Sequence, residues 1–545
     1  MTIGEKISAL RVLADMSQEQ LSEELSVSRQ SVSKWEMDQA LPQIDKVLQL
    51  CELFSVTSDE LLRDDIDIEK LNTSVDTAPD PSKNKYFGTD GFRGEANVNL
   101  TSLQAYKVGR FLGWYFSSPL CGYAKRNHRP RIVIGKDTRC SSSMLEYSIA
   151  AGITASGADA YMLHVTTTPS VPYATRQGEF DCGVMITASH NPYYDNGIKI
   201  VNQYGEKLDD KTTALIEAYL DGNLSVLGVN SDDLPLAQRD RIGQIVDYVA
   251  GRNRYVGYLI SVASHSYKGM RIGLDCANGA SWMIAKAVFD ALGAQIFLTG
   301  ASPDGLNINR DCGSTHIENL CTLVKENHLD VGFAFDGDAD RCIAVDENGN
   351  VVDGDGILYI LATRLKSRDI LDHDTMVATV MSNTGLIKAL QKVGIKCIQT
   401  SVGDRFVYEC MQEGGYRLGG EQSGHIILKK YATTGDGILT AIMIAEEMCD
   451  EKATLSALVK PVVLLPQLLK NLHVTDKAAV IADGDVQAKL QEISAEIGDN
   501  GRISLRKSGT EPVIRIMVEA ESMELCEKYA NALADVVKEK GFCCE

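Results

Sequence analysis

The sequence predicts a multidomain α/β protein that is preceded by an all-α segment. The chain has 545 residues, which is too long for a single hydrophobic core, so its size alone favours several domains. Short runs rich in apolar residues are each followed by apolar positions at helical spacing, a pattern typical of repeated parallel α/β units. Clear examples of such runs are 131–135, 270–275 and 375–380.

The first 65 residues form the predicted all-α segment. Short polar breaks separate apolar residues that recur at helical spacing, namely Ile3, Ile7, Leu10, Leu21, Leu25, Val32, Trp35, Val47, Leu50 and Phe54. The two-helix unit within 17–36 resembles a helix-turn-helix of the lambda-repressor/Cro type, whose second helix enters the major groove of DNA. The resemblance implies DNA contacts by Gln18, Gln30, Ser31 and Lys34.

The charge of this segment limits the DNA-binding prediction. Residues 1–65 contain six Lys or Arg and thirteen Asp or Glu, which gives a net charge near −7. Attraction to phosphate must therefore come from a local patch around Arg29 and Lys34. We expect DNA binding that is weak or that depends on dimerisation, and a helical bundle kept for protein contacts is the alternative.

Composition indicates a reduced, water-soluble protein. The net charge of −20 means that an anionic substrate must meet local cations, and the candidates are Arg93, Lys136, Arg139, Lys199, Arg341, Arg506 and Arg515. Fourteen Cys without a C-x-x-C pair indicate reduced thiols. Neither a signal peptide nor an 18-residue apolar run occurs, so we expect a cytoplasmic protein without membrane insertion.

Three aspartates, Asp336, Asp338 and Asp340, directly follow the apolar run 331–335. Period-2 spacing can aim all three carboxylates at one point, and so much negative charge is tolerable mainly around a cation. Oxygen ligands indicate a hard divalent metal. An EF-hand calcium loop is disfavoured because its sixth position would be Arg341 instead of Gly. A solvated acidic turn is the remaining alternative.

Ser189 is a candidate nucleophile. It follows the apolar run 182–188, which reads as a buried strand, and Pro192 forces a loop after it. A strand end displays a reactive hydroxyl on a rigid scaffold, but the G-x-S-x-G pattern of hydrolases is absent around this serine. The alternative is a serine that only hydrogen-bonds the following turn.

Two further loops suit a phosphorylated sugar. The segment 506–512 combines basic side chains with backbone N–H and hydroxyl donors, which suits a phosphate dianion, although an ordinary hairpin turn with a basic rim is the alternative. The segment 419–425 places a carboxylate, a hydroxyl and an imidazole between glycines. These groups can hydrogen-bond sugar hydroxyls or, through Glu421, an amino group.

The order of five motifs resembles that of the alpha-D-phosphohexomutases. The motifs are FGTDGFRG (87–94), TASHNPYYDNG (187–197), DGDADR (336–341), GGEQSGH (419–425) and RKSGTEP (506–512). Four stretches favour the branch of the family that acts on an amino sugar. These stretches are the EQSGH part of the fourth motif, CANGAS (276–281), and PDGLNIN with CGSTH (303–309 and 312–316).

The resemblance implies three related α/β domains and a small C-terminal α+β domain, with the active cleft between all four. The expected parts of the chain are a helix-turn-helix domain (1–65), a linker (66–85), domain I with the phosphoserine loop (86–250), domain II with the metal loop (251–350), domain III with the sugar loop (351–464) and domain IV with the phosphate-binding loop (465–545).

The resemblance also implies a role for each site residue. One Mg²⁺ would be held, together with a phosphoserine, by Ser189, Asp336, Asp338 and Asp340. The transferring group would be flanked by Arg93 and Arg341, and protons would be carried by Lys199 and His425. The hexose would contact Glu421 and Ser423, and the phosphate that does not react would be held by Arg506, Ser508, Gly509, Thr510 and Arg515.

The implied reaction is transfer of the Ser189 phosphate to a hexosamine 6-phosphate, which gives a bisphosphate that turns over before the other phosphate returns to the serine. Glucosamine 6-phosphate and glucosamine 1-phosphate would interconvert and would feed amino-sugar nucleotide and cell-wall precursor synthesis. Two alternatives remain: phosphomannomutase or phosphoglucomutase activity, and a transcription regulator whose mutase body senses sugar phosphates.

Two details of the sequence test this interpretation. Ala339 stands where the family usually carries Gly, and it would be strained if the backbone there needs a positive φ. The repeated sequence GDGIL at 354–358 and 435–439 precedes two apolar helices, and we expect Asp355 and Asp436 to be helix N-caps instead of ligands.

Overall fold

The structure is a computed structural model that describes residues 2–13, 16–54, 61–62, 85–88, 91–121, 128–507 and 513–543. These residues form two compact units. The first comprises Met1–Lys85 and Asp209–Asp233, and the second comprises Tyr86–Leu208 and Leu234–Glu545. Apart from Lys85, the predicted linker lies outside the described residues.

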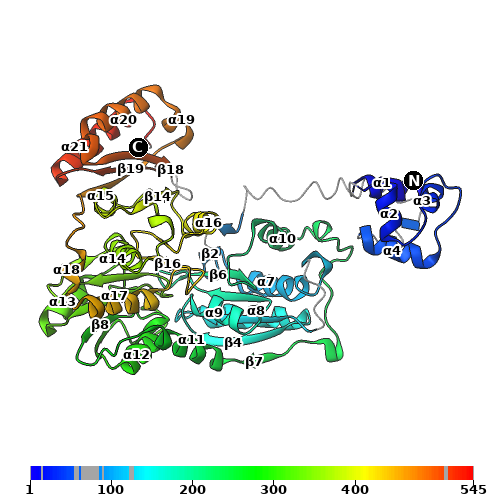
Figure 1. Cartoon of the computed structure of the whole chain (residues 1–545), viewed down its shortest axis with the longest axis horizontal. Helices are drawn as coiled ribbons and strands as arrows, with labels where there is room; N and C mark the ends of the chain where they lie inside the picture. Colours follow the sequence, from blue (N-terminus) through cyan, green and yellow to red (C-terminus); the bar gives the residue numbers. More distant parts are fainter. Residues whose placement is uncertain are drawn as a thin grey trace. The chain divides into compact units, whose positions relative to one another are not determined.

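Helices build the first unit. Its amino-terminal part contains α1 (Ile3–Leu13), α2 (Gln18–Glu24), α3 (Arg29–Glu36) and α4 (Ile44–Phe54), and its second segment contains α10 (Asp210–Leu220) and the short η3 (Ser225–Leu227) (Figure 1). In the amino-terminal part the apolar faces meet in a core where Leu21, Val32 and Leu50 are fully buried, as the helical spacing predicts. Ser28 caps α3, since its Oγ accepts the Ser31 N–H at 3.2 Å.

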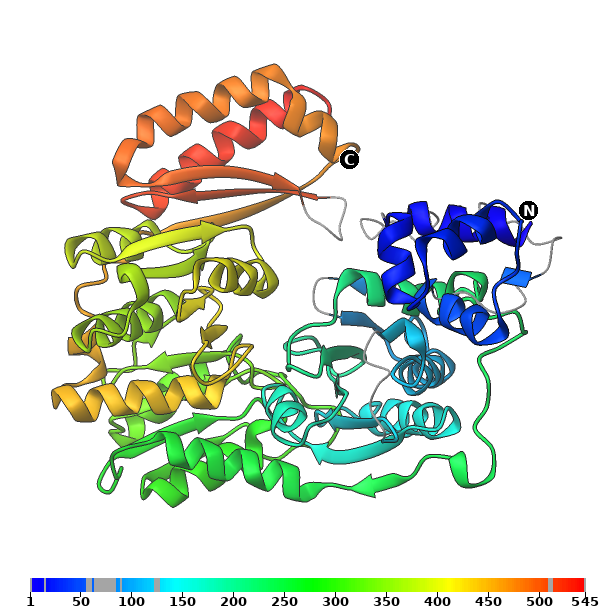
Figure 2. The ribbon, with the colours of Figure 1, turned by 45° about the vertical axis from the view of Figure 1, so that its right-hand side comes forward.

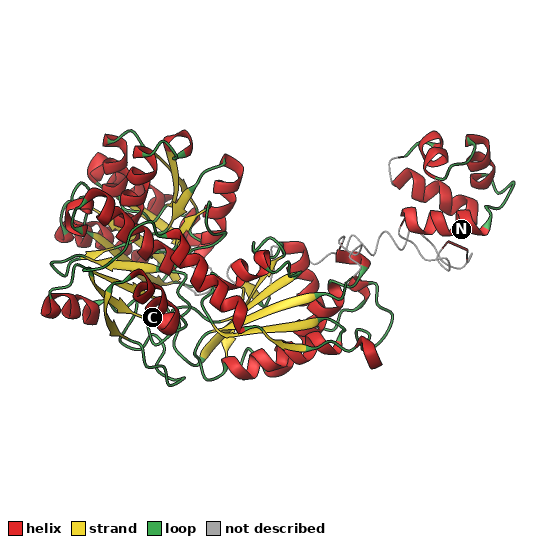
Figure 3. Ribbon diagram, turned by 60° about the horizontal axis from the view of Figure 1, so that its bottom comes forward, coloured by secondary structure: helices red, strands yellow, loops and turns green. Residues whose placement is uncertain are grey.

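A seven-stranded sheet opens the second unit, in the order β1-β2-β6-β5-β3-β4-β7. Its strands are β1 (Phe87–Gly88), β2 (Gly91–Glu95), β3 (Arg131–Lys136), β4 (Asp159–Val165), β5 (Cys182–Ile186), β6 (Asp195–Asn202) and β7 (Ile245–Asp247). The strand β3 runs parallel to β4 and β5, whereas β6 is antiparallel to β5 and β2. Helices flank the sheet (Figure 3), namely α7 (Ser102–Tyr115), α8 (Ser142–Ala155), α9 (Ser170–Gln177) and α11 (Val249–Val262).

Two smaller sheets follow. The second sheet has the order β12-β11-β10-β8-β9 and contains β8 (Arg271–Asp275), β9 (Gln295–Thr299), β10 (Val331–Phe335), β11 (Cys342–Val345) and β12 (Val351–Val352), with α12 (Ser281–Leu292) and α13 (Glu318–Asn327). The third sheet has the order β14-β13-β15-β16 and contains β13 (Thr375–Thr379), β14 (Lys396–Thr400), β15 (Leu418–Gly420) and β16 (Ile426–Leu428). Its helices are α14 (Gly354–Ser367), α15 (Thr384–Lys392), α16 (Asp404–Gly414), α17 (Gly437–Glu451) and α18 (Leu455–Val459). One continuous apolar core joins the two sheets.

The fourth sheet is antiparallel, in the order β17-β19-β18. It consists of β17 (Gln467–His473), β18 (Arg502–Lys507) and β19 (Val513–Glu519). Its helices are α19 (Lys477–Ala482), α20 (Gly484–Ile497) and α21 (Met523–Glu539). Figure 2 shows that these helices lie on one face of the sheet. They pack against it in a separate apolar core. The predicted fold class, α/β sheets with a small C-terminal α+β part and an all-α segment before them, is confirmed.

One of the two helix-cap predictions is wrong. Asp353, and not Asp355, caps α14, because Asp353 Oδ1 accepts the N–H groups of Asp355 and Gly356, both at 3.1 Å. Two aspartates stand two residues apart here, and the helix begins after the first. Asp355 instead lies in the first turn and accepts the Asn383 N–H at 2.7 Å. The prediction for Asp436, which caps α17, is confirmed.

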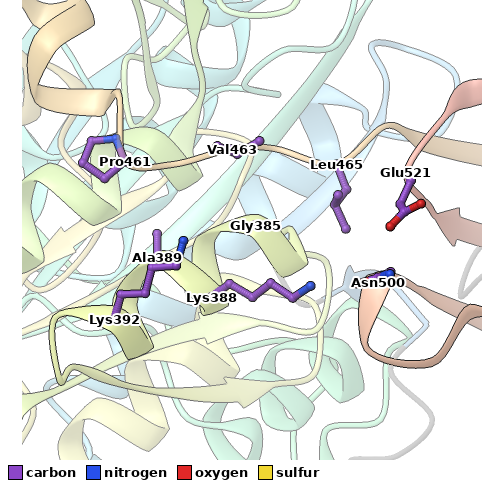
Figure 4. A pocket seen from close by; sticks show the side chains of 9 residues that line it. All are labelled: Gly385, Lys388, Ala389, Lys392, Pro461, Val463, Leu465, Asn500 and Glu521. Carbon is purple, nitrogen blue, oxygen red and sulfur yellow. The ribbon is translucent and has the colours of Figure 1, made fainter.

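A buried carboxylate joins the third and fourth sheets. Glu519 is fully buried and accepts hydrogen bonds from the Thr384 N–H (3.0 Å) and hydroxyl (2.6 Å), and from Arg502 (2.7 Å). Beside this joint lies a cleft of about 250 Å³ (Figure 4). It is lined by Gly385, Lys388, Ala389, Lys392, Pro461, Val463, Leu465, Asn500 and Glu521.

We expect Glu519→Ala to destabilise the protein by about 1 to 3 kcal/mol, because it leaves the partly buried Arg502 guanidinium and the Thr384 N–H without their acceptor. Calorimetric or chemical unfolding measures the loss. The exposed Glu521, two residues away, is the matched control, and its replacement by Ala is expected to change stability by about 0.5 kcal/mol or less. Equal effects of the two substitutions would contradict this account of the joint.

Candidate active site

The three aspartates meet at the end of β10. Carboxylate oxygens of Asp336, Asp338 and Asp340 lie within 4.8 Å of one another, and all three residues are buried. Ala339 between them has a φ of 58°. The backbone at this position therefore does adopt the left-handed conformation in which a Cβ is strained, as considered above.

Ser189 reaches this cluster from the first sheet. It follows β5, it is 1% exposed, and its hydroxyl donates to Asp336 Oδ2 at 2.5 Å. Its φ of 51° is also left-handed, which is disfavoured for a residue with a Cβ. Two segments that are 147 residues apart in the chain therefore meet at one point.

The cluster suits a hard divalent cation. Burial, together with the charges of Asp340 and Asp338, raises the pKa of Asp336 well above its usual range. Among the residues that the structure describes, Oδ1 of Asp338 is buried without a hydrogen-bond partner. Mg²⁺ and similar ions prefer carboxylate oxygen atoms as ligands. The cluster offers several of them close together, one of which accepts no hydrogen bond.

Proton competition predicts a pH dependence for this site. Because the pKa of Asp336 is raised in the folded protein, its proton is retained to higher pH, and a bound cation must displace it. We expect the affinity for Mg²⁺ to increase as the pH is raised over the range in which the protein stays folded, because the carboxyl group loses its proton more readily at higher pH. Thermal-shift titration with Mg²⁺ across this range measures the affinity. A constant affinity, or a weaker one at high pH, would contradict the expectation.

Lys199 lies on β6, where the antiparallel register places it opposite Met185. Its Nζ lies 3.0 Å from Asp338 Oδ2 and 3.1 Å from Asp340 Oδ2. Burial acts to raise the pKa of Asp340, but Lys199, His425 and Arg341 outweigh burial and hold this pKa well below its usual range. The cluster therefore contains one carboxyl group that readily keeps a proton and another that remains ionised.

His425 lies among acidic groups. Its Nδ1 is 3.6 Å from Asp340 Oδ1 and its Nε2 is 3.6 Å from Asp404 Oδ2. Burial acts to lower its pKa, but Asp340, Asp404 and Glu421 raise the pKa of His425 to about 9. The Gly435 N–H opposes them, since it donates to Nε2 at 3.0 Å and loses its acceptor if that nitrogen takes a proton. The ring is poised to hold or release a proton beside Asp340.

Two guanidinium groups act on His190, the residue after Ser189. Burial, then the positive charges of Arg341 and Arg93, lower the pKa of His190 to about 4, so this imidazole is neutral at neutral pH. Because His190 Nδ1 lies 3.4 Å from Ser189 Oγ, the same charges act on the serine. Arg93 also donates to Asn191 Oδ1 at 3.4 Å.

The sugar-loop residues lie between β15 and β16. Glu421 Oε1 accepts the Gly403 N–H at 3.1 Å, and the Ser423 hydroxyl donates to Glu421 Oε2 at 3.4 Å. The N–H of Gly403, just before α16, therefore orients Glu421. Asp404, the first residue of α16, in turn approaches His425.

The proposed phosphate cradle stands on the fourth sheet. Arg506 and Arg515 are opposite each other in the register of β18 and β19. Burial, Arg515 and Arg502 together lower the pKa of Arg506. Positive charge therefore accumulates where a phosphate would neutralise it. The predicted contacts Ser508, Gly509 and Thr510 lie outside the described residues, as do Thr89 and Asp90 of the first motif.

Sequence reasoning missed several residues of the site. Thr168 donates to Asp338 Oδ2 at 2.5 Å, and the loop carbonyls around Ser189 are bound by Arg139 and Asn309. Two of these residues carried a signal in the sequence, Arg139 as a candidate cation for an anionic substrate and Asn309 as the last residue of the motif 303–309, but neither was assigned a contact in the site. Thr168 lies just after β4, and Asn309 lies in the long loop between β9 and α13. Nothing local in the sequence links either residue to the serine.

Predicted DNA contacts lie in the first unit. Gln30 and Lys34 are exposed on α3, and Ser31 is partly exposed there. Gln18 begins α2, and its amide donates to Glu36 Oε2 at 2.6 Å. Glu36 also pairs with Arg11 at 2.5 Å, so the one acidic residue of α3 is neutralised.

Family models match nearly the whole chain. The four models named phosphoglucomutase/phosphomannomutase match domain I at 84–225, domain II at 253–349, domain III at 353–463 and the C-terminal domain at 469–536. A helix-turn-helix model matches 7–61. The fold and the site define a phosphohexomutase, an enzyme of the isomerase class that moves a phosphate within a sugar. The chain belongs to the phosphoglucomutase/phosphomannomutase family.

Curated relatives within the family carry one name. Phosphoglucosamine mutase of Lachnospira eligens is 59% identical over 458 residues, which cover 84% of this chain and 99% of that protein. Phosphoglucosamine mutase of Bacillus subtilis is 47% identical over 454 residues, which cover 83% and 98%.

Solved structures share the fold. A phosphoglucomutase/phosphomannomutase family protein of Burkholderia thailandensis has a TM-score of 0.68 at 23% identity and covers 84% of this chain and 97% of its own. N-acetylphosphoglucosamine mutase of Aspergillus fumigatus, in complex with GlcNAc-6P and magnesium, has a TM-score of 0.59 at 18% identity and covers 86% and 99%. Within the described ranges of the present chain, no helix is long and apolar enough to cross a membrane.

Proposed function

We propose that this chain interconverts glucosamine 6-phosphate and glucosamine 1-phosphate through a phosphoserine at Ser189 and a bisphosphate intermediate. The observation that carries the proposal is the 2.5 Å contact between Ser189 Oγ and Asp336 Oδ2 inside the aspartate cluster. The substrate follows from the curated relatives, which are named phosphoglucosamine mutase and are matched along nearly their whole length.

In this proposal one Mg²⁺ would be held by Asp336, Asp338 and Asp340 together with the phosphate of Ser189. When bound, the ion neutralises charge on the phosphoryl group as it transfers. Arg93 and Arg341 add positive charge on either side. Without such cations a phosphoserine, with a charge of about −1.5 to −2, would be strongly repelled by three carboxylates.

Lys199 or His425 transfers the proton to and from the sugar hydroxyl. Both side chains contact Asp340. Glu421 and Ser423 bind the hexosamine. Arg506 and Arg515, with Ser508, Gly509 and Thr510, hold the phosphate that does not react. Because either phosphate of the bisphosphate must occupy this cradle, side-chain donors that adapt to both orientations suit the task.

Turnover of three sugar phosphates tests the proposed substrate. We expect kcat/KM for glucosamine 6-phosphate to exceed the values for glucose 6-phosphate and mannose 6-phosphate. A higher value for glucose or mannose phosphate would assign the chain to phosphoglucomutase or phosphomannomutase activity instead.

Glu421→Gln is expected to reduce kcat/KM for glucosamine 6-phosphate about 10-fold and to affect glucose 6-phosphate much less. The reason is that a carboxylate bonds an ammonium group more strongly than a neutral amide does, by about 1.5 kcal/mol. The ratio of the two kcat/KM values measures this effect and is independent of the amount of active enzyme. An unchanged ratio would exclude Glu421 as the contact to the amino group.

DNA binding by the first unit is a second proposed function. It is favoured by the exposed face of α3, which presents Arg29, Gln30 and Lys34 while its single acidic residue is paired. A binding assay at low salt, with and without hexosamine phosphate, tests it. Arg29→Ala and Lys34→Ala should each lower affinity and reduce the salt dependence by about one counterion. No DNA affinity at low salt would reject the proposal.

A further inference from the structure

Two of the motifs that have no role in the reaction as proposed are CANGAS (276–281) and PDGLNIN (303–309), both from loops of the second sheet. Their loops bind each other, since the Asn309 N–H donates to the Ala277 carbonyl at 2.8 Å. The Asn309 side chain, which is 7% exposed, points away to the serine loop. Its Nδ2 donates to the carbonyl oxygens of Ser189 at 2.9 Å and Asn191 at 3.1 Å.

Arg139 binds the same two carbonyl groups from the first sheet. Its Nη2 donates to the oxygens of Ser189 at 2.8 Å and Asn191 at 2.9 Å. Its Nη1 donates to the carbonyl of Asp195 at 3.1 Å. The guanidinium is itself fixed, because Nε donates to Asp137 Oδ2 at 2.8 Å and both side chains are fully buried.

The serine loop is therefore held by side chains of two different sheets. Each of the carbonyls of Ser189 and Asn191 accepts one donor from Arg139 and one from Asn309. Four such bonds oppose relaxation of the left-handed backbone at Ser189. Arg139 anchors the loop to its own sheet, whereas Asn309 anchors it to the sheet that carries the aspartates.

The metal loop packs directly against this arrangement. A Cβ at Gly337 would lie 2.6 Å from the Ser189 carbonyl oxygen and 2.9 Å from Asn309 Nδ2, so only glycine permits the approach. The Ala280 N–H, from the CANGAS loop, donates to the Gly337 carbonyl at 2.8 Å. The same loops of the second sheet thus fix both the serine and the turn that bears Asp336.

We infer that Asn309 is a positioning residue for phosphoryl transfer, which completes with Arg139 a clamp on the backbone of the serine loop. This inference rests on the proposed phosphoserine mechanism. The clamp keeps the phosphate of Ser189 in line with the sugar hydroxyl. Asn309 touches neither the sugar nor the transferring group in this account, so it governs the rate of transfer and not the binding of the sugar phosphate.

Asn309→Asp tests the clamp, since Asp is nearly isosteric but lacks both N–H donors. The rate constant of transfer is measured in a single turnover, by mixing phosphorylated enzyme with sugar phosphate. We expect this rate constant to fall about 10- to 100-fold, as for a small misplacement of reacting groups, while KM stays within about twofold. A smaller fraction of folded enzyme does not change a single-turnover rate constant, so a purely structural defect would not produce this result.

Asn307→Ala is the matched control in the same loop. Among the described residues, the Asn307 side chain hydrogen-bonds within that loop alone, to the Ser302 carbonyl and the Asp304 N–H, both at 3.0 Å. We expect its transfer rate to remain within about twofold of wild type. Asn309→Ala should behave like Asn309→Asp, which excludes an effect of the new charge alone.

Equal transfer rates for Asn309→Asp, Asn307→Ala and wild type would overturn the clamp while leaving the proposed function intact. A raised KM with an unchanged transfer rate would also overturn it, because Asn309 would then act in binding. Wild-type enzyme that turns over without a phosphate on Ser189 would instead reject the proposed function itself, and the two failures are thereby distinguished.

Discussion

Ser189→Ala is expected to abolish mutase turnover, with a loss of about 10⁴-fold or more. In the proposed mechanism the serine hydroxyl carries the phosphate between the two ends of the sugar, and among the described residues it is the one hydroxyl that donates a hydrogen bond to Asp336. A coupled assay measures turnover, and intact-mass analysis shows whether the protein carries one added phosphate. The variant should carry none.

Ser423→Ala is the control for this substitution. Its hydroxyl belongs to the sugar loop, so the variant should keep the added phosphate on Ser189 and should lose only part of its activity. Turnover by Ser189→Ala at a tenth of the wild-type rate, or a phosphate on that variant, would contradict the assignment of the nucleophile.

Asp338→Asn is expected to lower turnover by about 10³-fold and to weaken binding of Mg²⁺. The carboxylate of Asp338 faces Asp336 and Asp340 and holds Lys199 at 3.0 Å and Thr168 at 2.5 Å. The substitution preserves the shape of the side chain but removes the charge that binds the cation. Calorimetric titration with Mg²⁺ and the coupled assay measure the two effects.

Thr168→Val is the matched control, because it removes one hydrogen bond to Asp338 and leaves all three carboxylates. We expect it to cost about 10-fold or less, the loss of one hydrogen bond to a charged group. Removal of Mg²⁺ by a chelator should reproduce the loss of Asp338→Asn in wild-type protein, and added Mg²⁺ should restore it. Normal Mg²⁺ affinity in Asp338→Asn would contradict the metal assignment.

Local patterns in the sequence predict much of the fold. The apolar runs 131–135, 270–275 and 375–380 coincide to within one residue with β3, β8 and β13, and the run 331–335 before the aspartates forms β10. The apolar positions of the amino-terminal helices form one core. Such elements follow from short-range periodicity, which a single sequence displays. The prediction that Asp355 caps α14 is wrong because Asp353, two residues earlier, offers the same capping group and the helix begins directly after it.

The site is less accessible to sequence reasoning, because its geometry depends on contacts between distant segments. Nothing near Ser189 indicates that Asn309 binds its carbonyl group, 120 residues away. Thr168, in the loop after β4, and Asp404, the first residue of α16, likewise acquire a role only when the fold brings them to Asp338 and His425. The sequence predicts strain at Ala339 only if the backbone there has a positive φ, and the observed φ of 58° meets this condition.

The most direct test of the central claim follows the phosphate itself. Enzyme labelled with ³²P on Ser189 is mixed with unlabelled glucosamine 6-phosphate and quenched at short times. We predict that the label leaves the protein for the sugar, first in the bisphosphate and then in the monophosphates, at a rate no slower than kcat. Label that remains on the protein, or that appears only as inorganic phosphate while the mutase turns over, would contradict the account.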